Sequence, residues 1–489
     1  MFHHLASFLA IPFAIIAIII WKEPRYIFDT FWWSVEDDVP SRTHLPNVPS
    51  HADTTAIILN WSRLPNVLKI VATLCQPQSE NTISQIFIWN NSPHKINHTT
   101  FAETGCPSEV LRIHNSPTNL YFQARFLACE QVSTPFCFIQ DDDYLVRPET
   151  VRAMRSHITE QSTSSIHLLP PFEMLSSQFR TMDVGSDLHT SFAWLGYGTL
   201  IPRKMAKDFL SLLQQLNVSD EITKMADNYF TVLRNSIPEM WFDNGVELGG
   251  GQPFTVGVEG DERNKHHIAT QMLNLLISQR YSLQGKDVPF INFQYTRSPS
   301  ISRAPCMGRL CIFETSIPLL PLDVPSLAPH AEEMLSLEAT RMQTFGRDRI
   351  EHYINHPPSH AVDGQNETCF KSPEHAKEGD WISLDLVQLR SDPISVYMIV
   401  DKSTEAILSQ SCLFEIFTDD WASIQASFAC SDWDIGLRLC SLVIQHPRQY
   451  ENRWGKFRAR LRESVEKGWQ ICEIWARDMG RVGLLTSQV

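Results

Sequence analysis

The sequence has no surplus of basic residues. Its 489 residues include 41 lysines and arginines against 55 aspartates and glutamates, which gives a formal net charge of −14 at pH 7. Because lysine and arginine supply most of the affinity for nucleic-acid phosphates, this balance argues against a broad nucleic-acid-binding surface. Hydrophobic residues make up 43% and charged residues 20%. This is the composition of a globular protein with a true core, and the length suits two or three domains.

The sequence also lacks the cysteine and histidine spacings of zinc sites. It has neither a CxxC pair nor a Cys/His cluster of that kind. Its eleven cysteines suit an oxidising compartment, where disulfides persist, but an odd number cannot all pair. Cys306 and Cys311, in CMGRLC, either close a small disulfide loop or are two unrelated buried thiols.

The N-terminus lacks two features of a cleaved signal peptide. No positive residues precede the apolar segment, and no small-residue cleavage site follows it. Leu5 to Trp21 is a run of 17 uncharged residues, at the short end for a membrane span of ~20 residues. We therefore predict a transmembrane signal anchor over residues 5–21, preceded by a cytoplasmic tail, 1–4, and followed by a stem, 22–52.

Two signals disagree about orientation. Lys22 and Arg25 follow the apolar run, and the positive-inside rule would place that side in the cytosol. Sequons for N-glycosylation favour a lumenal body. They occur at Asn60, Asn90, Asn97, Asn217 and Asn366. Asn60 and Asn90 fall within expected strands, but we still expect a single-pass protein of the Golgi or endoplasmic reticulum membrane with a lumenal body.

Strand-like and helix-like patterns alternate after the stem. TTAIILNW, ISQIFIWNN and PFCFIQ are apolar, β-rich runs, whereas VLKIVATLCQ and NLYFQARFLACEQV have helical spacing. This alternation is typical of βαβ units and predicts a mostly parallel sheet flanked by helices over residues 53–300. Such sheets bind ligands at the carboxyl ends of their strands. Asn90, Asn91 and the aspartates of QDDD fall at these ends.

Asp141, Asp142 and Asp143 directly follow an apolar strand. Adjacent carboxylates repel one another unless a positive charge lies between them, and a divalent cation would relieve that repulsion. A cation held by one or two carboxylates keeps positions open for the phosphates of a nucleoside diphosphate. A solvated acidic turn is the alternative interpretation. The apolar strand, the βαβ series and the secretory features favour the metal site.

Several motifs follow one another in the order of a known family. AIILNWSRLPNVLKIVATL, ISQIFIWNN, ARFLACEQVSTPFCFIQDDD, HTSFAWLGYGTLIPRKMAKDFL and MADNYFTVLRN together resemble the glycosyltransferase domain at the C-terminal end of exostosins, over about residues 54–276. The resemblance implies a GT-A fold, a UDP-sugar donor, Mn²⁺ as cofactor and a glycan or glycoprotein acceptor. It also implies transfer with retention of configuration, of a sugar such as an N-acetylhexosamine. Met225 departs from the family, which has a cysteine there, so a family disulfide at this position is lost.

The resemblance also implies roles for individual residues. The residues that would bind the nucleotide sugar are Asn90, Asn91, Arg125, Asp141, Asp142, Arg263 and Lys265. The residues that would bind the metal are Asp143, Asp141 and His266. Asp227 would be catalytic, stabilising an oxocarbenium-like transition state or orienting the acceptor hydroxyl. An ordinary first-turn helix aspartate is the alternative for Asp227, and a solvated helix start is the alternative for the residues from 263 to 266.

The C-terminal third of the chain has a different pattern. Residues 301–345 begin Pro-rich and irregular and continue as AEEMLSLEATRMQTFG, so we expect a linker and a connecting helix. WISLDL alternates between apolar and polar residues with period two, SVYMIV and LFEIF do so approximately, and WQICEIW closes the series. These short segments predict a β-sandwich over residues 346–480. This segment resembles the discoidin, or coagulation-factor type C, jelly-roll family. The resemblance implies a galactose-binding-like domain that binds carbohydrate or lipid headgroups.

Two functions from different classes fit these features. One is a lumenal, metal-dependent retaining glycosyltransferase with an accessory β-sandwich. The other is a membrane-anchored carbohydrate-binding protein whose GT-A domain is inactive.

Overall fold

The computed structural model describes residues 51–159, 164–184, 188–243, 245–250, 288–295, 300–321, 334–373, 375–390, 393–444 and 454–478. These residues belong to one compact unit, His44–Val489. The expected anchor at 5–21, most of the stem and the site residues Arg263, Lys265 and His266 lie outside the described residues. Within the described part, none of the helices combines the length and the apolar character needed to cross a membrane.

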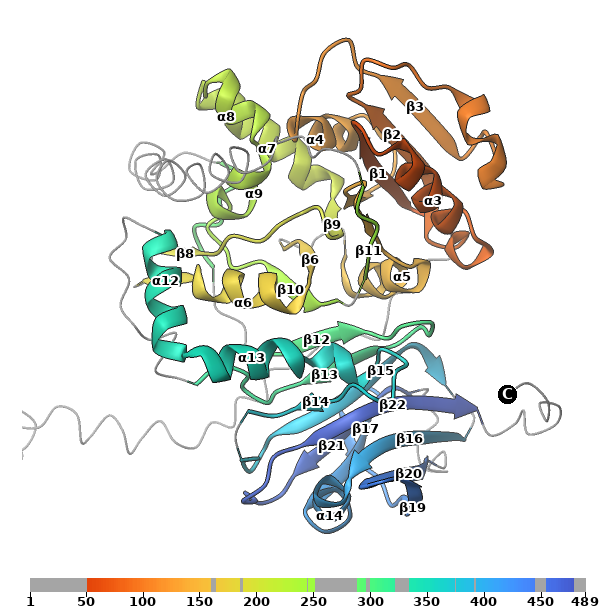
Figure 1. The fold of residues 1–489 in the computed structure, drawn as a ribbon, viewed down its shortest axis with the longest axis vertical. Helices are drawn as coiled ribbons and strands as arrows, with labels where there is room; N and C mark the ends of the chain where they lie inside the picture. Colours follow the sequence, from red (N-terminus) through yellow and green to blue (C-terminus); the bar gives the residue numbers. More distant parts are fainter. Residues whose placement is uncertain are drawn as a thin grey trace, which may run out of the picture. The chain divides into compact units, whose positions relative to one another are not determined.

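Seven described strands form a mostly parallel sheet (Figure 1), in the order β10-β6-β9-β4-β1-β2-β3. They are β1 (Thr54–Asn60), β2 (Ile83–Asn90), β3 (Leu111–Asn115), β4 (Phe136–Gln140), β6 (Ile166–Leu169), β9 (Thr199–Pro202) and β10 (Glu239–Phe242). Neighbouring strands run parallel except at β9, which is antiparallel to β4 and β6. The prediction of a mostly parallel α/β sheet is therefore confirmed.

Helices cover both faces of this sheet. They are α3 (Leu64–Leu74), α4 (Gln123–Glu130), α5 (Pro148–His157), α6 (Pro171–Phe179), α7 (Arg203–Gln215), α8 (Asp220–Lys224) and α9 (Asp227–Leu233). Along β1, Ala56 and Ile58 pack in the cluster that contains α3 and α5 residues, whereas Ile57 and Leu59 pack in the cluster of α4, α7 and α9. Burial on both faces explains why these strands are continuous apolar runs in the sequence.

Two further pairs of short strands accompany the sheet. One pair is β5 (Tyr144–Leu145) with β11 (Val246–Glu247), and the other is β7 (Met182–Val184) with β8 (Leu188–Thr190). The first pair matters for the site, because it brings the chain after β10 back beside the aspartates that follow β4.

The C-terminal part consists of two antiparallel sheets, as the alternating pattern predicted. The six-stranded sheet contains β12 (Ser302–Pro305), β13 (Ile312–Thr315), β15 (Trp381–Arg390), β21 (Trp454–Leu461), β17 (Cys412–Phe417) and β18 (Trp421–Ser423). The five-stranded sheet contains β14 (Phe370–Lys371), β22 (Gln470–Asp478), β16 (Ile394–Asp401), β20 (Leu437–Ile444) and β19 (Ser427–Asp434). The accompanying helices are α12 (Met334–Phe345), α13 (Arg347–Asn355) and α14 (Lys402–Gln410).

The segment 301–345 differs from the expected linker. It contains the connecting helix, α12, but its first part is a hairpin, β12–β13, whose second strand pairs with β15. Prolines made this part look irregular in the sequence. Pro305 is tolerated because it ends β12, which lies at the edge of its sheet. The all-β part therefore begins near residue 302, earlier than the predicted residue 346.

Five disulfides join ten of the eleven cysteines, all of which are described. They are Cys75–Cys106, Cys129–Cys137, Cys306–Cys311, Cys369–Cys472 and Cys430–Cys440. Cys412 is free and buried. The small loop in CMGRLC is therefore closed by a disulfide, and it lies at the tip of the β12–β13 hairpin.

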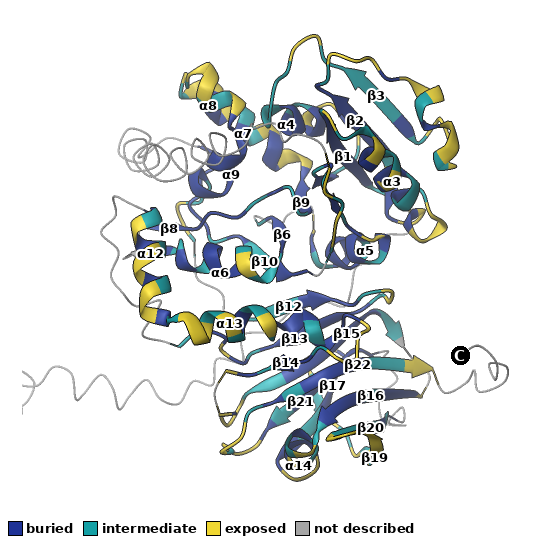
Figure 2. Cartoon of the chain, in the orientation of Figure 1, coloured by how far each residue is buried: buried dark blue, intermediate teal, exposed yellow. Residues whose placement is uncertain are grey.

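The two parts of the body share a hydrophobic core. Phe179 of α6 packs against Phe345 of α12 with ring centroids 5.6 Å apart, and Phe242 of β10 packs against Tyr353 of α13 at 5.8 Å. In Figure 2 the strands of the parallel sheet are largely buried, whereas α12 and α13 each have an exposed face. The helices α12 and α13 thus join the parallel sheet to the antiparallel sheets.

Candidate functional site

Asparagine amides lie at the carboxyl ends of β1, β2 and β3, and those of Asn60 and Asn90 are buried. The Asn60 amide donates to Asn90 Oδ1 at 2.7 Å, and the Asn90 amide donates to Asn115 Oδ1 at 2.8 Å. Asn91 Oδ1 accepts from the backbone N–H of Leu120 at 3.1 Å. The predicted residues Asn90 and Asn91 therefore lie at the expected edge of the sheet. Their side chains hydrogen-bond to the protein itself and hold the strand ends in register.

Arg125 connects two predicted acidic residues that are far apart in the sequence. Its side chain is fully buried, Nη2 lies 2.6 Å from Asp141 Oδ1, and Nη1 lies 2.7 Å from Asp227 Oδ2. Asp141 follows β4, and Asp227 is the first residue of α9. The structure thus brings together Arg125, Asp141 and Asp227, three of the predicted site residues, in one group of ion pairs.

Burial makes this trio electrostatically unusual. It raises the pKa of Asp227 to about 7, although the charge of Arg125 opposes the shift. Burial also raises the pKa of Asp141, again against Arg125. Arg125 Nε and Asp227 Oδ1 are buried without a hydrogen-bond partner among the described residues. Perturbed carboxyl groups and unsatisfied buried polar atoms are concentrated at functional sites.

A glycine allows Asp141 to reach its position. The Asp141 N–H donates to the carbonyl of Gly196 at 2.9 Å. A Cβ atom at residue 196 would lie 2.0 Å from Asp141 Oδ2, far inside van der Waals contact. Any larger residue at position 196 would therefore displace the Asp141 carboxylate.

Arg63 is a site residue that sequence reasoning missed. Its Nη1 lies 2.9 Å from Asp142 Oδ1 and 2.9 Å from Asp143 Oδ2. Asp142 is buried, and burial together with the charge of Asp141 raises the pKa of Asp142 to about 6, against Arg63. A signal was present in the sequence, because Arg63 directly follows the carboxyl end of β1, where ligand-binding side chains are expected.

We call residues 248–250 the glycine strap. Three backbone groups of this strap are hydrogen-bonded to the cluster. The Leu248 N–H donates to the Asp143 carbonyl at 2.7 Å, and the Asn66 amide donates to the Gly249 carbonyl at 2.6 Å. Arg63 Nε donates to the Gly250 carbonyl. The strap is therefore attached both to the aspartates and to the start of α3.

The pair Asp142 and Asp143 fits a cation. Their oxygens converge on a single nitrogen of Arg63, which stands in for a positive ion, and Asp143 is 46% exposed. Carboxylate oxygens are the preferred ligands of hard divalent cations, so the pair could hold Mn²⁺ in place of the guanidinium. In the described ranges, no three His, Cys, Asp or Glu side chains are grouped as a metal site. The third predicted ligand, His266, lies outside those ranges.

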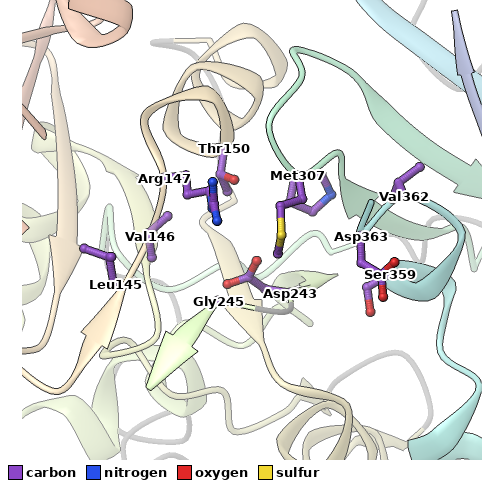
Figure 3. Close-up of a pocket in the computed structure, with 11 residues that line it drawn as sticks. Leu145, Val146, Arg147, Thr150, Asp243, Gly245, Met307, Ser359, Val362 and Asp363 are labelled. Carbon is purple, nitrogen blue, oxygen red and sulfur yellow. The ribbon is translucent and has the colours of Figure 1, made fainter. Parts of the chain in front are cut away.

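A cavity beside β5 and α5 is separate from this cluster (Figure 3). Side chains that include Arg147, Asp243, Met307 and Asp363 line it. Its volume of about 20 Å³ has room for about one water molecule. It cannot hold a nucleotide sugar.

Neither a protein-family model nor a curated protein matches the sequence significantly. One similar solved structure is the mannosyltransferase PcManGT from Pyrobaculum calidifontis in complex with GDP-Man and Mn²⁺. The sequence identity is 12%, the match covers 56% of this chain and 74% of that chain, and the TM-score is 0.31. S. aureus TarS in complex with UDP has 12% identity, coverages of 47% and 72%, and a TM-score of 0.29. The module CBM32-1 from a family 31 glycoside hydrolase of Clostridium perfringens has 16% identity, coverages of 24% and 81%, and a TM-score of 0.19. At these identities and TM-scores, similarity does not by itself establish a shared fold or activity.

Proposed function

We propose that this chain is a glycosyltransferase of the GT-A type that transfers a sugar from a nucleotide-sugar donor, a UDP-sugar. The observation that carries the proposal is the buried ion pairing of Arg125 with Asp141 and Asp227. This ion-paired group lies at the carboxyl edge of the mostly parallel sheet. Beside it, the carboxylates of Asp142 and Asp143 both contact the guanidinium of Arg63. The resemblance of residues 54–276 to exostosins supports the same assignment.

The proposed reaction follows from these positions. The bond between sugar C1 and the diphosphate oxygen breaks, and its electron pair stays on that oxygen. The acceptor hydroxyl oxygen bonds to C1, and its proton passes to the departing diphosphate. Arg125 holds Asp227, whose carboxylate stabilises positive charge at C1 or orients the acceptor. A divalent cation held by Asp142 and Asp143 would neutralise charge on the diphosphate.

The sugar and the acceptor are further proposals. We propose an N-acetylhexosamine as the transferred sugar, with retention of configuration, and a glycan or glycoprotein as the acceptor. The resemblance to exostosins supports both. The antiparallel sheets, with their resemblance to the discoidin family, would add affinity for carbohydrate.

We also propose that the body lies in the lumen of the secretory pathway, behind the anchor at residues 5–21. The disulfides support an oxidising compartment. Asn97, Asn217 and Asn366 are exposed, whereas Asn60 and Asn90 are buried and could not carry glycan in the folded state. Treatment with a glycosidase should lower the mass of the native protein. If the mass did not change and all three exposed sequons were unmodified, lumenal placement would be contradicted.

An inactive, carbohydrate-binding protein is the second candidate. It is favoured by one observation, the guanidinium of Arg63 on Asp142 and Asp143, which offsets part of the charge of the pair without a metal. In that case the parallel sheet would be a scaffold for the antiparallel sheets.

Nucleotide binding separates the two candidates. We expect the soluble body, residues 44–489, to bind UDP in titration calorimetry more tightly with Mn²⁺, and to hydrolyse a UDP-sugar slowly. Asp143→Asn should lose the Mn²⁺-dependent part of the affinity. Asp208→Asn, which changes a carboxylate on α7 paired with Lys204, is the matched control. If the wild-type body binds no UDP with or without Mn²⁺, the carbohydrate-binding alternative becomes the better supported of the two.

A further inference from the structure

We infer that Arg63 is an internal counter-ion that competes with the divalent cation for Asp142 and Asp143. In the structure, the same guanidinium also holds the glycine strap against the aspartates. Arg63 is thus a positioning residue for donor binding, and its displacement is part of loading the site. This inference rests on the proposed function and goes beyond it.

Arg63 and a divalent cation would occupy the same position between Asp142 and Asp143. Asp142 Oδ1 and Asp143 Oδ2 both lie 2.9 Å from Arg63 Nη1, so one nitrogen occupies the point on which both carboxylates converge. A divalent cation bound by both oxygens would need that point. Two positive charges there would repel each other strongly, since screening by solvent is weak around a guanidinium that is only 13% exposed. Binding of one therefore excludes binding of the other.

The balance of charge around the aspartates also favours exchange of Arg63 for a divalent cation. Asp141 and Asp227 share the buried Arg125, and Asp142 and Asp143 share Arg63. Two guanidinium groups thus face four carboxyl groups, and a nucleoside diphosphate would add more negative charge. One monovalent guanidinium at Asp142 and Asp143 does not offset that charge, whereas a divalent cation does so better. Donor binding therefore favours exchange of Arg63 for the metal.

Arg63 also links the aspartates to the glycine strap. Arg63 Nε donates to the Gly250 carbonyl while Nη1 holds the aspartates. Leu248 is bonded to Asp143, and Asn66, one turn along α3, is bonded to Gly249. The buried atoms Arg125 Nε and Asp227 Oδ1 lack partners among the described residues, so a ligand bound here could supply them. Release of Arg63 removes one of the three hydrogen bonds that hold the strap.

A purely structural ion pair makes a different prediction. If Arg63 only stabilised the loop after β1, its removal would lower the melting temperature without a gain in metal affinity. If it competes with the metal, its removal leaves two uncompensated carboxylates and increases affinity for a cation. Mn²⁺ affinity in the absence of nucleotide therefore distinguishes the two roles.

The experiment measures Mn²⁺ binding to the soluble body, residues 44–489, by electron paramagnetic resonance of the free ion, without nucleotide. Arg63→Gln should bind Mn²⁺ at least about tenfold more tightly than wild type, because one unit of repulsive charge within contact distance is removed. Arg63→Lys keeps the charge but cannot bridge both carboxylates and Gly250, and it should give a smaller gain. Arg112→Gln is the control, since Arg112 on β3 hydrogen-bonds to the Gln131 carbonyl, away from the site. It should leave Mn²⁺ affinity unchanged.

The outcomes separate this inference from the proposed function. Mn²⁺ affinity that is unchanged or lower in Arg63→Gln overturns the inference, and if that variant does not fold, the same result in Arg63→Lys overturns it. UDP binding by the wild type in Mn²⁺, measured alongside, supports the proposed function whichever result Arg63→Gln gives. If the wild type binds no UDP even in Mn²⁺, the proposed function fails, and the inference fails with it.

Discussion

At the scale of single residues, the candidate site consists of charged side chains that are in close contact, and several of them are buried. Arg125 is fully buried and Asp227 nearly so, and Gly196 leaves only enough room for the Asp141 carboxylate. Small changes of volume or charge at these positions should therefore affect ligand binding more than folding. Two predictions follow from this close packing.

The first prediction concerns the space at Gly196. Gly196→Ala would place a methyl group on the Asp141 carboxylate, which must then move away from Arg125. We expect UDP affinity to fall by tenfold or more, since a charge-assisted contact is worth about 1.5–3 kcal/mol. Calorimetric titration with UDP and Mn²⁺ measures this loss. Gly308→Ala is the control: nothing lies near a Cβ there, and its φ of +69° should cost only backbone strain of about 1 kcal/mol. Equal UDP affinity in wild type and Gly196→Ala would contradict the prediction.

The second prediction concerns the ionisation of Asp227. With its pKa raised by burial to about 7, the carboxylate forms fully only above neutral pH, so turnover should rise with pH through about 7. Asp227→Asn should lower kcat by about 10²-fold or more, abolish this rise and keep UDP binding. Asp220→Asn, at the exposed start of α8, should do none of these. A pH profile unchanged in shape in Asp227→Asn would rule out the assigned role.

The same group also has a predicted effect on stability. The folded-state pKa of Asp227 lies above the unfolded value of about 3.9, so the folded state binds this proton more tightly. Stability should therefore decrease as pH rises from about 4 to about 7. In Asp227→Asn this contribution should be absent, and its melting temperature should depend less on pH over that interval.

At the scale of elements, a chain of buried charges joins the parallel sheet to the antiparallel sheets. Glu239 of β10 pairs with Arg303 of β12 at 3.2 Å, and Arg303 pairs with Glu314 of β13 at 2.8 Å. Glu314 then pairs with Lys456 of β21 at 2.8 Å. Burial alone would raise the pKa of Glu314, but the charges of Lys456 and Arg303 outweigh it and hold that pKa below its usual value. Each member therefore depends on its neighbours.

The third prediction is that Glu314→Gln destabilises the body by about 3–5 kcal/mol, because Lys456 and Arg303 would be left buried without their shared partner. Urea unfolding measures the change. Glu351→Gln removes an exposed i,i+4 pair with Arg347 and should cost less than about 0.5 kcal/mol.

Since the pKa of Glu314 is lowered by folding, the stabilisation is present above the unfolded value of about 4.3 and is lost as pH falls below it. A loss under 1 kcal/mol at pH 7 would show that the chain of charges is not needed for stability.

At the scale of the whole molecule, the described body has two sheet systems but a continuous core. Phe179 and Phe242 on one side contact Phe345 and Tyr353 on the other, and the β12–β13 hairpin completes the six-stranded sheet. We therefore expect the body to unfold in a single cooperative transition, with no separate transition for the C-terminal part.

The fourth prediction concerns where the C-terminal part begins. A fragment of residues 300–478 should fold, although less stably than the same residues in the body, because the surfaces against α6 and β10 are exposed. A fragment of residues 331–478 should not fold, because β15 loses β13 and the fully buried Ile312 and Phe313 are missing. Thermal melts followed by circular dichroism compare the two. A cooperative transition in the shorter fragment would place the boundary after the hairpin.

The sequence by itself determined the local structure and the main acidic residues of the site. Apolar runs buried on both faces predicted the parallel strands, period-two alternation predicted the later antiparallel ones, and QDDD marked the end of β4. These patterns depend on residues close together in the chain, where spacing decides which face a side chain occupies. Pro305 in the β12–β13 hairpin helped to hide two strands, because proline in a strand at the edge of a sheet looks the same in a sequence as proline in a linker.

Only the tertiary structure decided which charges meet. Arg63 lies beside Asp142 and Asp143 because β1 and β4 are parallel neighbours, with Ile58 opposite Gln140. Arg125 meets Asp227 because α4 and α9 pack on the same face of the sheet. Strand order and helix packing depend on how all the apolar faces fit together, and no local pattern specifies that arrangement. The positive charges that offset the three aspartates, Arg63 at Asp142 and Asp143 and Arg125 at Asp141, therefore became apparent only in the folded chain.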